Sequence, residues 1–543
     1  MGVVLYILFI CCIQYISSDI PLSEQLAGSR PNIVLIMADD MGWGDIGANY
    51  NQTRDTPFLD QLASISLRLP DYHSGASICS VSRAALLTGR LTPRTGVWTN
   101  FASTALGGLP TNETIIPELL KTVGYTTAIH GKWHLGHRPP FHPAYRGFDQ
   151  YIGVPFSLDM GCTDNPGANL PPVDPCPKDP ALRFFENNHE QPGDIEKVVE
   201  GVLTVGIPLY QCLKPQCTDD NCNNDIIEQP VNLSTLTQSY IDNDRRFIQN
   251  SVAAKQPFFL YLPLSHMHVP HDYAAQFKNS SAKPSIYGDT LRELDYHVNQ
   301  TYQLLNELNI LNQTLFIFTS DNGPWSSKCE LAGSQGPFLG TWQTLPSPAG
   351  GGGGGTAKFT TWEAGHRVPF IAHWPSVIKP GTVSNAIGSN LDLMPTFAKL
   401  AGFSLPANRS FDGIDLSPVL FDGSNQGHEF LFHPDELGHL TAVRYNQYKA
   451  FYSTYSAIDG ACGGKIGLIL DHKPPLIFDL SQDQAESTPV QVPQAVYDAI
   501  DQALQAKLND ISSTPHTKSD YGIGGLDARA CCDAGHIVCR CKN

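Results

Sequence analysis

A cysteine and an arginine four residues apart are the first candidates for chemistry in this chain of 543 residues. Cys79 begins the segment 79–89, which we expect to be a loop running into a short helix. A thiol at a helix N-terminus meets unpaired N–H groups and the positive end of the helix dipole. Arg83 would lie one turn further along the same face. The pair therefore predicts an anion site, although a free cysteine is more often buried and inert.

Oxygen-bearing side chains end two apolar runs that are far apart in the sequence. The runs at 33–38 and 315–318 are continuous and apolar, which is typical of buried parallel strands. Ligands gather at the carboxyl ends of strands in open α/β sheets, so we expect the two ends to meet. A turn or helix cap is the alternative for either pair taken alone. Their oxygen atoms favour Ca²⁺ or Mg²⁺ over Zn²⁺. The four residues are Asp39, Asp40, Asp321 and Asn322.

Basic side chains follow further strand-like runs. Two apolar runs, 125–129 and 258–262, are each followed within a few residues by lysine or histidine. A single residue of this kind is most often solvated or structural, so only the joint arrangement favours a site. The basic candidates are Lys132, His134, His268 and Lys358, the last of which precedes the segment 359–367.

Together these motifs resemble those of the sulfatase family, and they occur in the same order along the chain. In that family the signature cysteine is oxidised after synthesis to a formylglycine. The likeness covers residues 31–541 and is closest to the arylsulfatase A branch. Besides the motifs above, the segments that carry it are Gly147–Asp149, Val154–Ser157, Pro474–Ser481 and the closing cysteines Cys531, Cys532, Cys539 and Cys541.

The resemblance implies a role for each candidate. A formylglycine-generating enzyme would convert Cys79 during synthesis, and one Ca²⁺ ion would be held by Asp39, Asp40, Asp321 and Asn322. The implied catalytic residues are Cys79, Arg83, Lys132, His134, His268 and Lys358. The implied substrate-binding residues are Lys132, Ser157, His268 and Lys358.

A reaction follows from these implied roles. A sulfate monoester is a tetrahedral anion, so its charge must be neutralised before a nucleophile approaches. A hydrated formylglycine would attack sulfur with one oxygen, and the other would expel sulfate as the aldehyde forms again. On this interpretation His268 and Lys358 assist the departing alcohol, and His134 takes the proton of the second hydroxyl. Arg83 and Lys132 orient the diol.

Val81 departs from the family pattern, in which proline is the usual third residue of the signature. This leaves open a non-catalytic secreted glycoprotein on a sulfatase scaffold, which would keep an unmodified thiol at position 79. A phosphoryl hydrolase of the related alkaline-phosphatase-like group is the other alternative. Those enzymes usually carry a Ser or Thr nucleophile and two zinc ions bound by histidine, and the clusters above do not provide that set.

The charge balance limits the kinds of partner that we expect. The chain has 35 Lys and Arg against 52 Asp and Glu, a formal net charge of −17 and a pI near 5.4. A nucleic-acid binder should show a basic face, so we expect no nucleic-acid partner. The 18 histidines and the excess carboxylates fit an acidic compartment, where protonation reduces the negative charge. The family implies a small sulfated substrate, either an aryl, a sugar or a lipid sulfate, and the sequence leaves a homo-oligomer open.

The N-terminus predicts entry into the secretory pathway. Residues 3–16 are apolar but too few to span a bilayer, which indicates a signal peptide over residues 1–18. No later segment reaches spanning length, so we expect a soluble glycoprotein that is lysosomal or secreted. Seven glycosylation sequons support this route. They lie at Asn51, Asn112, Asn232, Asn279, Asn299, Asn312 and Asn408.

The cysteines are typical of an oxidising compartment. Of 14, two lie in the signal peptide and Cys79 is assigned to the site, so the odd remainder leaves one unpaired or shared between chains. One cluster lies between residues 162 and 222 and another between 531 and 541. Both predict loops closed by disulfides. Zinc binding is the weaker alternative, since neither cluster has a C-x₂-C pair.

The succession of elements predicts an α/β fold of the alkaline-phosphatase-like type, with a large, mostly parallel sheet flanked by helices. Apolar runs alternate with helical stretches such as 289–308. A run of six glycines at 350–355, close to Lys358, is expected to be disordered or highly mobile.

A second domain is predicted after the alternating pattern ends. The short strands 441–444 and 449–453 precede a helix near 495–508. We therefore predict a sulfatase catalytic domain at 19–426 and a smaller C-terminal α+β domain with a cysteine-rich tail at 427–543.

Overall fold

The computed structural model describes residues 20–178, 205–214, 225–455, 467–524, 528–533 and 538–541. The expected signal peptide lies outside the described residues. So do Cys217, Cys222 and Cys462.

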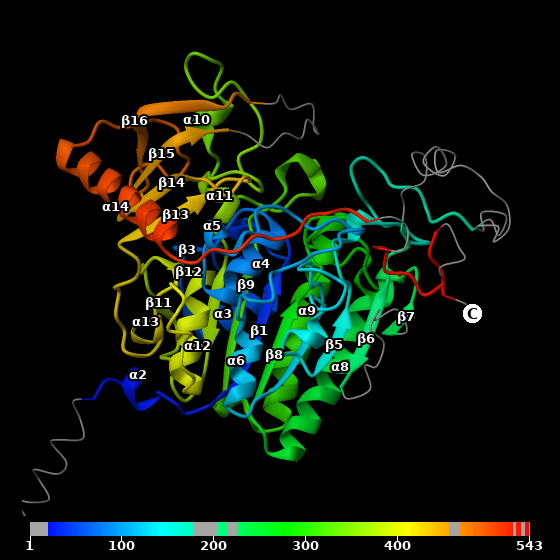
Figure 1. The fold of residues 1–543 in the computed structure, drawn as a ribbon. Coiled ribbons are helices and arrows are strands. Elements are labelled where there is room, and N and C mark those ends of the chain that lie inside the picture. Colours follow the sequence, from blue (N-terminus) through cyan, green and yellow to red (C-terminus); the bar gives the residue numbers. More distant parts are fainter. Residues whose placement is uncertain are drawn as a thin grey trace, which may run out of the picture.

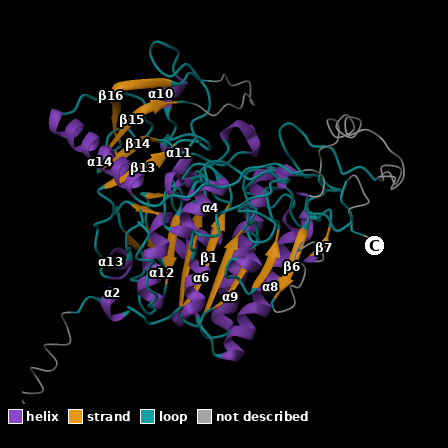
Figure 2. Cartoon of the chain, in the orientation of Figure 1, coloured by secondary structure: helices purple, strands orange, loops and turns teal. Residues whose placement is uncertain are grey.

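A sheet of ten strands forms the centre of the large domain (Figures 1 and 2). Its order is β11-β2-β10-β9-β1-β8-β4-β5-β6-β7. The central strands β9, β1, β8, β4 and β5 are parallel, whereas β10 and β6 pair antiparallel with them. The mostly parallel sheet is therefore confirmed. The strands are β1 (Asn32–Ala38), β2 (Leu67–Arg68), β4 (Thr126–His130), β5 (Gln150–Gly153), β6 (Leu209–Leu213), β7 (Ile226–Glu228), β8 (Phe258–Pro263), β9 (Thr314–Ser320), β10 (Phe370–His373) and β11 (Thr382–Val383).

Helices cover both faces of this sheet. α3 and α8 pack on α9 along one face, and α4 and α6 pack on α12 along the other. Because both faces are covered, the central strands are apolar throughout, and residues 33–38 have no exposed surface. The helices of this domain are α2 (Leu22–Gln25), α3 (Pro57–Ser64), α4 (Cys79–Thr88), α5 (Thr92–Thr95), α6 (Ile116–Thr122), α8 (Leu233–Ala254), α9 (Ile286–Glu307), α10 (Thr341–Thr344), α11 (Glu363–His366), α12 (Leu393–Ala401) and α13 (Ser417–Phe421).

The predicted helix at 289–308 is α9, and local signals explain its bounds. The side chain of Ser285 caps its N-terminus by accepting a hydrogen bond from the N–H of Gly288 at 2.9 Å. Leu291, Leu294 and Val298 lie on one face and are buried against the core.

The C-terminal domain is a separate antiparallel sheet of order β13-β14-β15-β16, covered by one long helix. It lies above the large sheet in Figure 1, at the edge of the sheet near α4. Leu504 and Ile500 of the helix pack with Val443 and Ile477 of the sheet. The elements are β13 (Phe430–Pro434), β14 (Leu440–Tyr445), β15 (Tyr448–Thr454), β16 (Leu470–Asp479) and α14 (Gln494–Ser513). A small sheet pairs β3 (Tyr72–His73) with β12 (Gly388–Ser389).

After α14 the chain returns along the large domain and ends in disulfides. The predicted disulfides are present in both cysteine clusters. The cysteines of the tail are paired with each other, so they are not available to bind zinc. The pairs are Cys162–Cys176, Cys531–Cys539 and Cys532–Cys541, and Cys212 and Cys329 are also disulfide-bonded.

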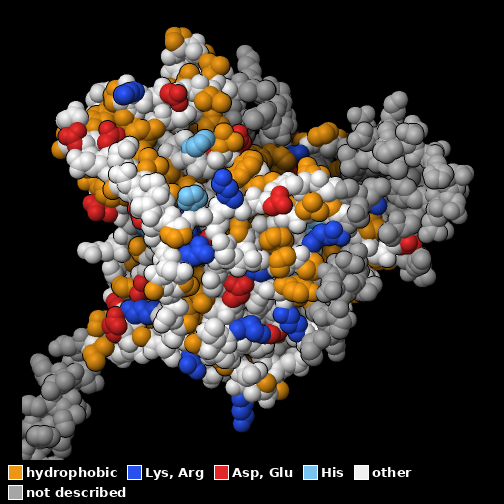
Figure 3. Space-filling view, viewed as in Figure 1, with side chains coloured by type: hydrophobic (Ala, Val, Ile, Leu, Met, Phe, Trp, Pro, Cys, Tyr) orange, Lys and Arg blue, Asp and Glu red, His pale blue; other side chains and the backbone are white. Residues whose placement is uncertain are grey.

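Charged side chains are sparse on the surface drawn in Figure 3, as the 16% of charged residues in the sequence predicts. They are scattered there among uncharged ones. Within the part of the chain that the structure describes, we find no helix with the length and apolar character needed to cross a bilayer.

The run of six glycines differs from the expectation of disorder. The side-chain amide of Gln343 donates to the carbonyl oxygens of Gly351 and Gly353, at 3.2 and 3.0 Å. The N–H of Gly351 also donates to the carbonyl of Trp342 at 3.1 Å. A Cβ atom at Gly351 would lie 2.4 Å from the amide nitrogen of Gln343. Glycine is needed here because the loop lies against a buried side chain.

Candidate active site

Two neighbouring strands bring the predicted oxygen ligands together. β1 and β9 are parallel, with Ala38 opposite Ser320, so the residues that follow them meet at one edge of the sheet. The N–H of Asp321 donates to the carbonyl of Ala38 at 3.0 Å. The N–H of Asp40 donates to the Asp321 carboxylate at 3.2 Å. All four candidates, Asp39, Asp40, Asp321 and Asn322, are buried.

Asn322 shows that this oxygen cluster suits a cation. Its amide nitrogen donates to Asp40 Oδ1 at 2.7 Å and to the carbonyl of Gly323 at 2.8 Å. Its Oδ1 is buried and has no hydrogen-bond partner among the described residues. An unpaired buried acceptor is costly unless a cation or water lies beside it. With the three carboxylates it forms a set of oxygen donors, so the residues fit Ca²⁺.

Each carboxylate is matched by one buried cation. Lys132, just beyond β4, places Nζ 2.6 Å from Asp39 Oδ2. Lys358 Nζ lies 2.8 Å from Asp40 Oδ2. The guanidinium of Arg83 donates to Asp321 Oδ2 from Nε at 3.0 Å and from Nη2 at 2.8 Å. Three positive charges therefore balance three negative ones inside the protein.

Burial and neighbouring charges act against each other on these groups. Burial acts to raise the pKa of Asp39, but Lys132 and Arg83 hold that pKa well below its usual value. Burial and the charge of Asp39 raise the pKa of Asp321 to about 7. Burial acts to lower the pKa of Lys358, yet Asp40 raises it overall. The negative charge of Asp39 disfavours ionisation of Asp321, and a further cation would offset this repulsion.

Cys79 is the first residue of α4, as the sequence predicts, and its side chain is fully buried. Its Sγ lies 3.5 Å from Asp39 Oδ1 and 4.0 Å from Asp40 Oδ1. It is the free cysteine of the described residues. Burial raises the pKa of the thiol, although Lys132 acts to lower it. Burial therefore favours the neutral thiol form of an unmodified Cys79.

Ser157 and His268 complete one side of the cluster. The Nζ of Lys132 donates to Ser157 Oγ at 3.1 Å. The same oxygen lies 3.2 Å from His268 Nε2, which is 3.5 Å from Asp40 Oδ2. His268 Nδ1 is 2.6 Å from the carbonyl of Val269 and must donate to it. In the neutral ring Nε2 therefore carries the lone pair and faces the site.

His134 lies next to the start of α4, because its carbonyl contacts Ser80. Its Nε2 donates to the carbonyl of Phe101 at 3.1 Å, so Nδ1 carries the lone pair. That Nδ1 is buried and has no partner among the described residues. Burial and the charge of Lys132 hold the pKa of His134 well below its usual value, which keeps the ring neutral. Its carbonyl also accepts a hydrogen bond from Ser80 at 2.7 Å, next to Cys79.

Two side chains beside this cluster were not among the sequence candidates. Trp325 follows the Asp321 strand end by four positions, and its ring lies 4.6 Å from Lys358 Nζ. Asp159 follows Ser157 by two positions and is partly exposed, although its Oδ1 is buried. Their closeness to the predicted motifs was a signal in the sequence, but neither residue type carried enough chemistry on its own to be selected.

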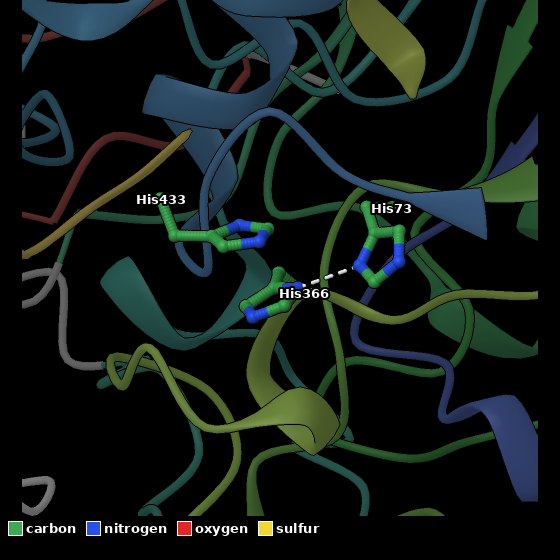
Figure 4. A group of neighbouring side chains, drawn as sticks. All are labelled: His73, His366 and His433. Atoms are coloured by element: carbon green, nitrogen blue, oxygen red, sulfur yellow. Dashed lines mark hydrogen bonds between the residues drawn. The ribbon is translucent and has the colours of Figure 1, made fainter. Parts of the chain in front are cut away.

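A second buried cluster joins the two domains (Figure 4). His73 lies on β3, His366 ends α11 and His433 lies on β13. The Nδ1 atoms of His73 and His366 are 2.9 Å apart. Lys449 Nζ lies 2.9 Å from His366 Nε2, and His73 Nε2 lies 2.7 Å from Asp71 Oδ1. The ammonium of Lys449 only donates and the carboxylate of Asp71 only accepts, so all three hydrogen bonds point the same way. Lys449 donates to His366, His366 donates from Nδ1 to His73 Nδ1, and His73 donates from Nε2 to Asp71.

The spacing of the three imidazoles also meets that of a metal site, because one nitrogen of each lies within 4.8 Å of the others. The hydrogen-bonded chain uses the lone pairs that a metal would need. Three cations already surround the cluster, and each is paired with a carboxylate: Lys449 and Arg367 with Glu363, and Arg444 with Asp71. Because His366 and His73 already use their ring nitrogens in this hydrogen-bonded chain, we assign no metal here.

Glu486 closes this interface from the C-terminal domain. Its Oε2 accepts a hydrogen bond from the N–H of Glu363 at 2.9 Å, and its Oε1 lies 3.3 Å from Lys449 Nζ. Burial raises the pKa of Glu486 to about 7; the charge of Lys449 acts to lower it and that of Glu363 to raise it.

Comparison with known proteins places all candidate residues of the first cluster within one matched region. The sulfatase family profile matches residues 31–403, and that of the C-terminal region of aryl-sulfatase matches residues 426–541. Arylsulfatase G from Rattus norvegicus is 45% identical over 533 residues, covering 96% of this chain and 95% of that protein. Arylsulfatase A from Bos taurus is 36% identical over 493 residues, covering 88% and 87%.

A solved structure shows the same architecture. The PsFucS1 sulfatase from Pseudoalteromonas sp. superposes with a TM-score of 0.74 at 26% sequence identity, covering 92% of this chain and 96% of that one.

Proposed function

The chain belongs to the sulfatase family, whose members hydrolyse sulfate esters, and we propose that it does so with a formylglycine made from Cys79 beside one calcium ion. The observation that most supports this is the position of Cys79. Its side chain lies 3.5 Å from Asp39 at the start of α4, inside a cluster in which three cations face three carboxylates.

The proposed cation and nucleophile belong to the same cluster of buried side chains. A calcium ion held by Asp39, Asp40, Asp321 and Asn322 would supply a Lewis acid that polarises the sulfate. A formylglycine at position 79 would supply, as its hydrate, a hydroxyl group that attacks sulfur. Lys132, Lys358 and Arg83 add positive charge within the same buried volume, where electrostatic stabilisation is strong because water is excluded.

Two histidines of the cluster would transfer protons. The free Nδ1 of His134 is suited to accept a proton from the hydroxyl that does not attack. Ser157 and Lys132, which hydrogen-bond to each other, would bind the sulfate oxygens. Lys358 Nζ, and His268 Nε2 once the ring is protonated, would deliver a proton to the departing alcohol; both atoms lie near Asp40.

The remaining expectations belong to the same proposal. A formylglycine-generating enzyme would act on the chain during synthesis, in the secretory pathway, and the mature enzyme would be lysosomal or secreted. The disulfides and the sequons support that route. We also propose a boundary between the two domains near residue 427, which is supported by the start of the C-terminal sheet at Phe430.

Mass spectrometry of the peptide that contains residue 79 tests the modification directly. We expect an aldehyde there and hydrolysis of nitrophenyl sulfate. A thiol in the whole population, with no hydrolysis, would instead support the non-catalytic scaffold.

Metal binding is tested by a readout other than activity. We expect Ca²⁺ to raise the melting temperature of the wild type but not that of Asp321→Ala, which should also be inactive. Asp498→Ala on the exposed face of α14 is the matched control and should behave as the wild type. Full activity in Asp321→Ala, or stoichiometric zinc in the purified protein, would contradict the proposed calcium site.

A further inference from the structure

The chain beyond α14 lies against the segment that follows α5. The N–H of Leu106 donates to the carbonyl of Gly522 at 2.9 Å, and the N–H of Gly524 donates to that of Thr104 at 3.1 Å. Tyr521 belongs to this contact and packs against the core of the large domain. Figure 1 shows this part of the chain, in red, passing across the large domain near α4.

The side chain of Tyr521 holds the segment 98–101. Its hydroxyl accepts hydrogen bonds from the N–H groups of Trp98 and Thr99, at 2.9 and 3.3 Å, and donates to the carbonyl of Thr99 at 3.2 Å. Its ring stacks on that of Phe101, with the centroids 4.8 Å apart and 10° between the planes. One residue of the C-terminal region therefore fixes both the backbone and a side chain of this segment.

The same segment contacts the start of α4 and the candidate proton acceptor. Asn100 Oδ1 accepts from the N–H of Ser80, the residue after Cys79, at 2.9 Å. This N–H lies in the first turn of α4, where it has no partner within the helix, so Asn100 caps it. The carbonyl of Phe101 accepts from His134 Nε2 at 3.1 Å.

Ser80 closes the network between these elements. Its Oγ donates to the carbonyl of His134 at 2.7 Å, and the N–H of Phe101 donates to the same Oγ at 3.4 Å. The backbone and the ring of His134 are therefore both held. Because Nε2 donates to Phe101, Nδ1 keeps the lone pair that would accept a proton. Without that acceptor the ring would be free to turn, or to carry its hydrogen on Nδ1 instead.

We infer that Tyr521 is a positioning residue for the release of sulfate, because through the segment 98–101 it holds His134 with the lone pair on Nδ1. The role depends on the proposed function. After the alcohol has left, sulfate is esterified to one oxygen of residue 79. Nδ1 then takes the proton of the second hydroxyl, the electrons of that O–H bond form the aldehyde, and the bond from carbon to the sulfate oxygen breaks. The earlier attack on sulfur does not use His134.

Tyr521→Phe tests this role, because it keeps the aromatic ring and removes the hydroxyl. With para-nitrophenyl sulfate, nitrophenol appears when sulfur is attacked and sulfate appears on release. Rapid quenching, followed by mass spectrometry of the peptide of residue 79, measures the sulfate ester on the enzyme. We expect its release to slow about tenfold, so that the ester accumulates. As release becomes limiting, kcat and KM should fall together, and kcat/KM should not change.

Two further variants separate positioning from a structural role. Tyr125→Phe is the matched control, because it removes a hydroxyl that donates to the carbonyl of Pro31 at 2.6 Å. Tyr125 precedes β4, whereas His134 follows the other end of that strand, so release should be as in the wild type. Adding Tyr521→Phe to His134→Ala should cause no further loss, since the tyrosine acts through the histidine.

The outcomes separate the positioning role from the proposed function. An unchanged release rate in folded Tyr521→Phe would overturn the role, and so would a kcat/KM that falls in proportion to kcat. An equal loss with and without His134 would also overturn it. If Tyr521→Phe does not fold, Asn100→Ala frees the same segment from α4, and unchanged release there would have the same meaning. A wild type that contains formylglycine but hydrolyses no sulfate ester would instead refute the proposed function.

Discussion

Replacing Glu486 by glutamine should change how the stability of this protein depends on pH. Glu486 is fully buried between the domains, where it accepts from the N–H of Glu363 and lies near Lys449. Its pKa is raised from 4.5 to about 7, with burial as the largest cause. Glutamine has the same shape and stays neutral at every pH, so it resembles the protonated side chain.

The sign follows from the raised pKa. A carboxyl group that binds its proton more tightly in the folded state contributes stability that is fully present below pH 4.5. That contribution is lost as the pH rises through about 7. The difference between the two pKa values corresponds to roughly 3 kcal/mol. In a chain of this length about 1 kcal/mol moves the melting temperature by about 1 °C, so we expect roughly 3 °C.

Thermal unfolding of the wild type and of Glu486→Gln, followed between pH 4.5 and 8, measures this difference. The two melting temperatures should be close at the acidic end, and the variant should become the more stable protein as the pH rises. Glu307→Gln, at the exposed end of α9, is the matched control and should show no such trend. The three buried histidines also titrate, but they contribute to both proteins alike and cancel in the comparison.

Melting temperatures that stay parallel across this range would refute the reasoning. They would mean that Glu486 is ionised in the folded protein at the same pH as in the unfolded chain. A variant that is less stable at pH 8 than the wild type would show that the charge pair with Lys449 outweighs the cost of burial.

Two further predictions concern the signature and the glycine run. Val81→Pro should raise the fraction of aldehyde at residue 79, measured by peptide mass spectrometry, because proline reduces the entropy that the unfolded segment loses on binding its modifying enzyme. The variant should fold, since residue 81 lies in the first turn of α4, where the N–H has no intrahelical partner; equal conversion in both proteins would remove Val81 as a cause. Gly351→Ala should destabilise the protein by about 1–3 kcal/mol, because the added Cβ meets the amide of Gln343. Urea unfolding should show a smaller loss on adding Gly351→Ala in a Gln343→Ala background, and equal losses in the two backgrounds would contradict the steric cause.

The sequence by itself determined the sheet and the chemical type of the candidate site. The apolar runs at 33–38 and 315–318 could be read as buried strands because a strand covered on both faces needs apolar side chains throughout. The residues that follow them could be paired in advance, since parallel strands end at the same edge of a sheet. Their oxygen atoms then fixed the class of cation that the site would suit.

Only the tertiary structure decided which atoms pair and which remain unused. The contact between His73 and His366 joins segments 293 positions apart, and no local periodicity indicates it. The free Oδ1 of Asn322 and the free Nε1 of Trp325 are defined by the packing of every neighbour around them. The glycine run was predicted to be mobile from its composition, yet the buried Gln343 holds it in place. Local sequence pattern records whether a residue is buried, whereas hydrogen-bond partners depend on the register and packing of segments that are distant in the chain.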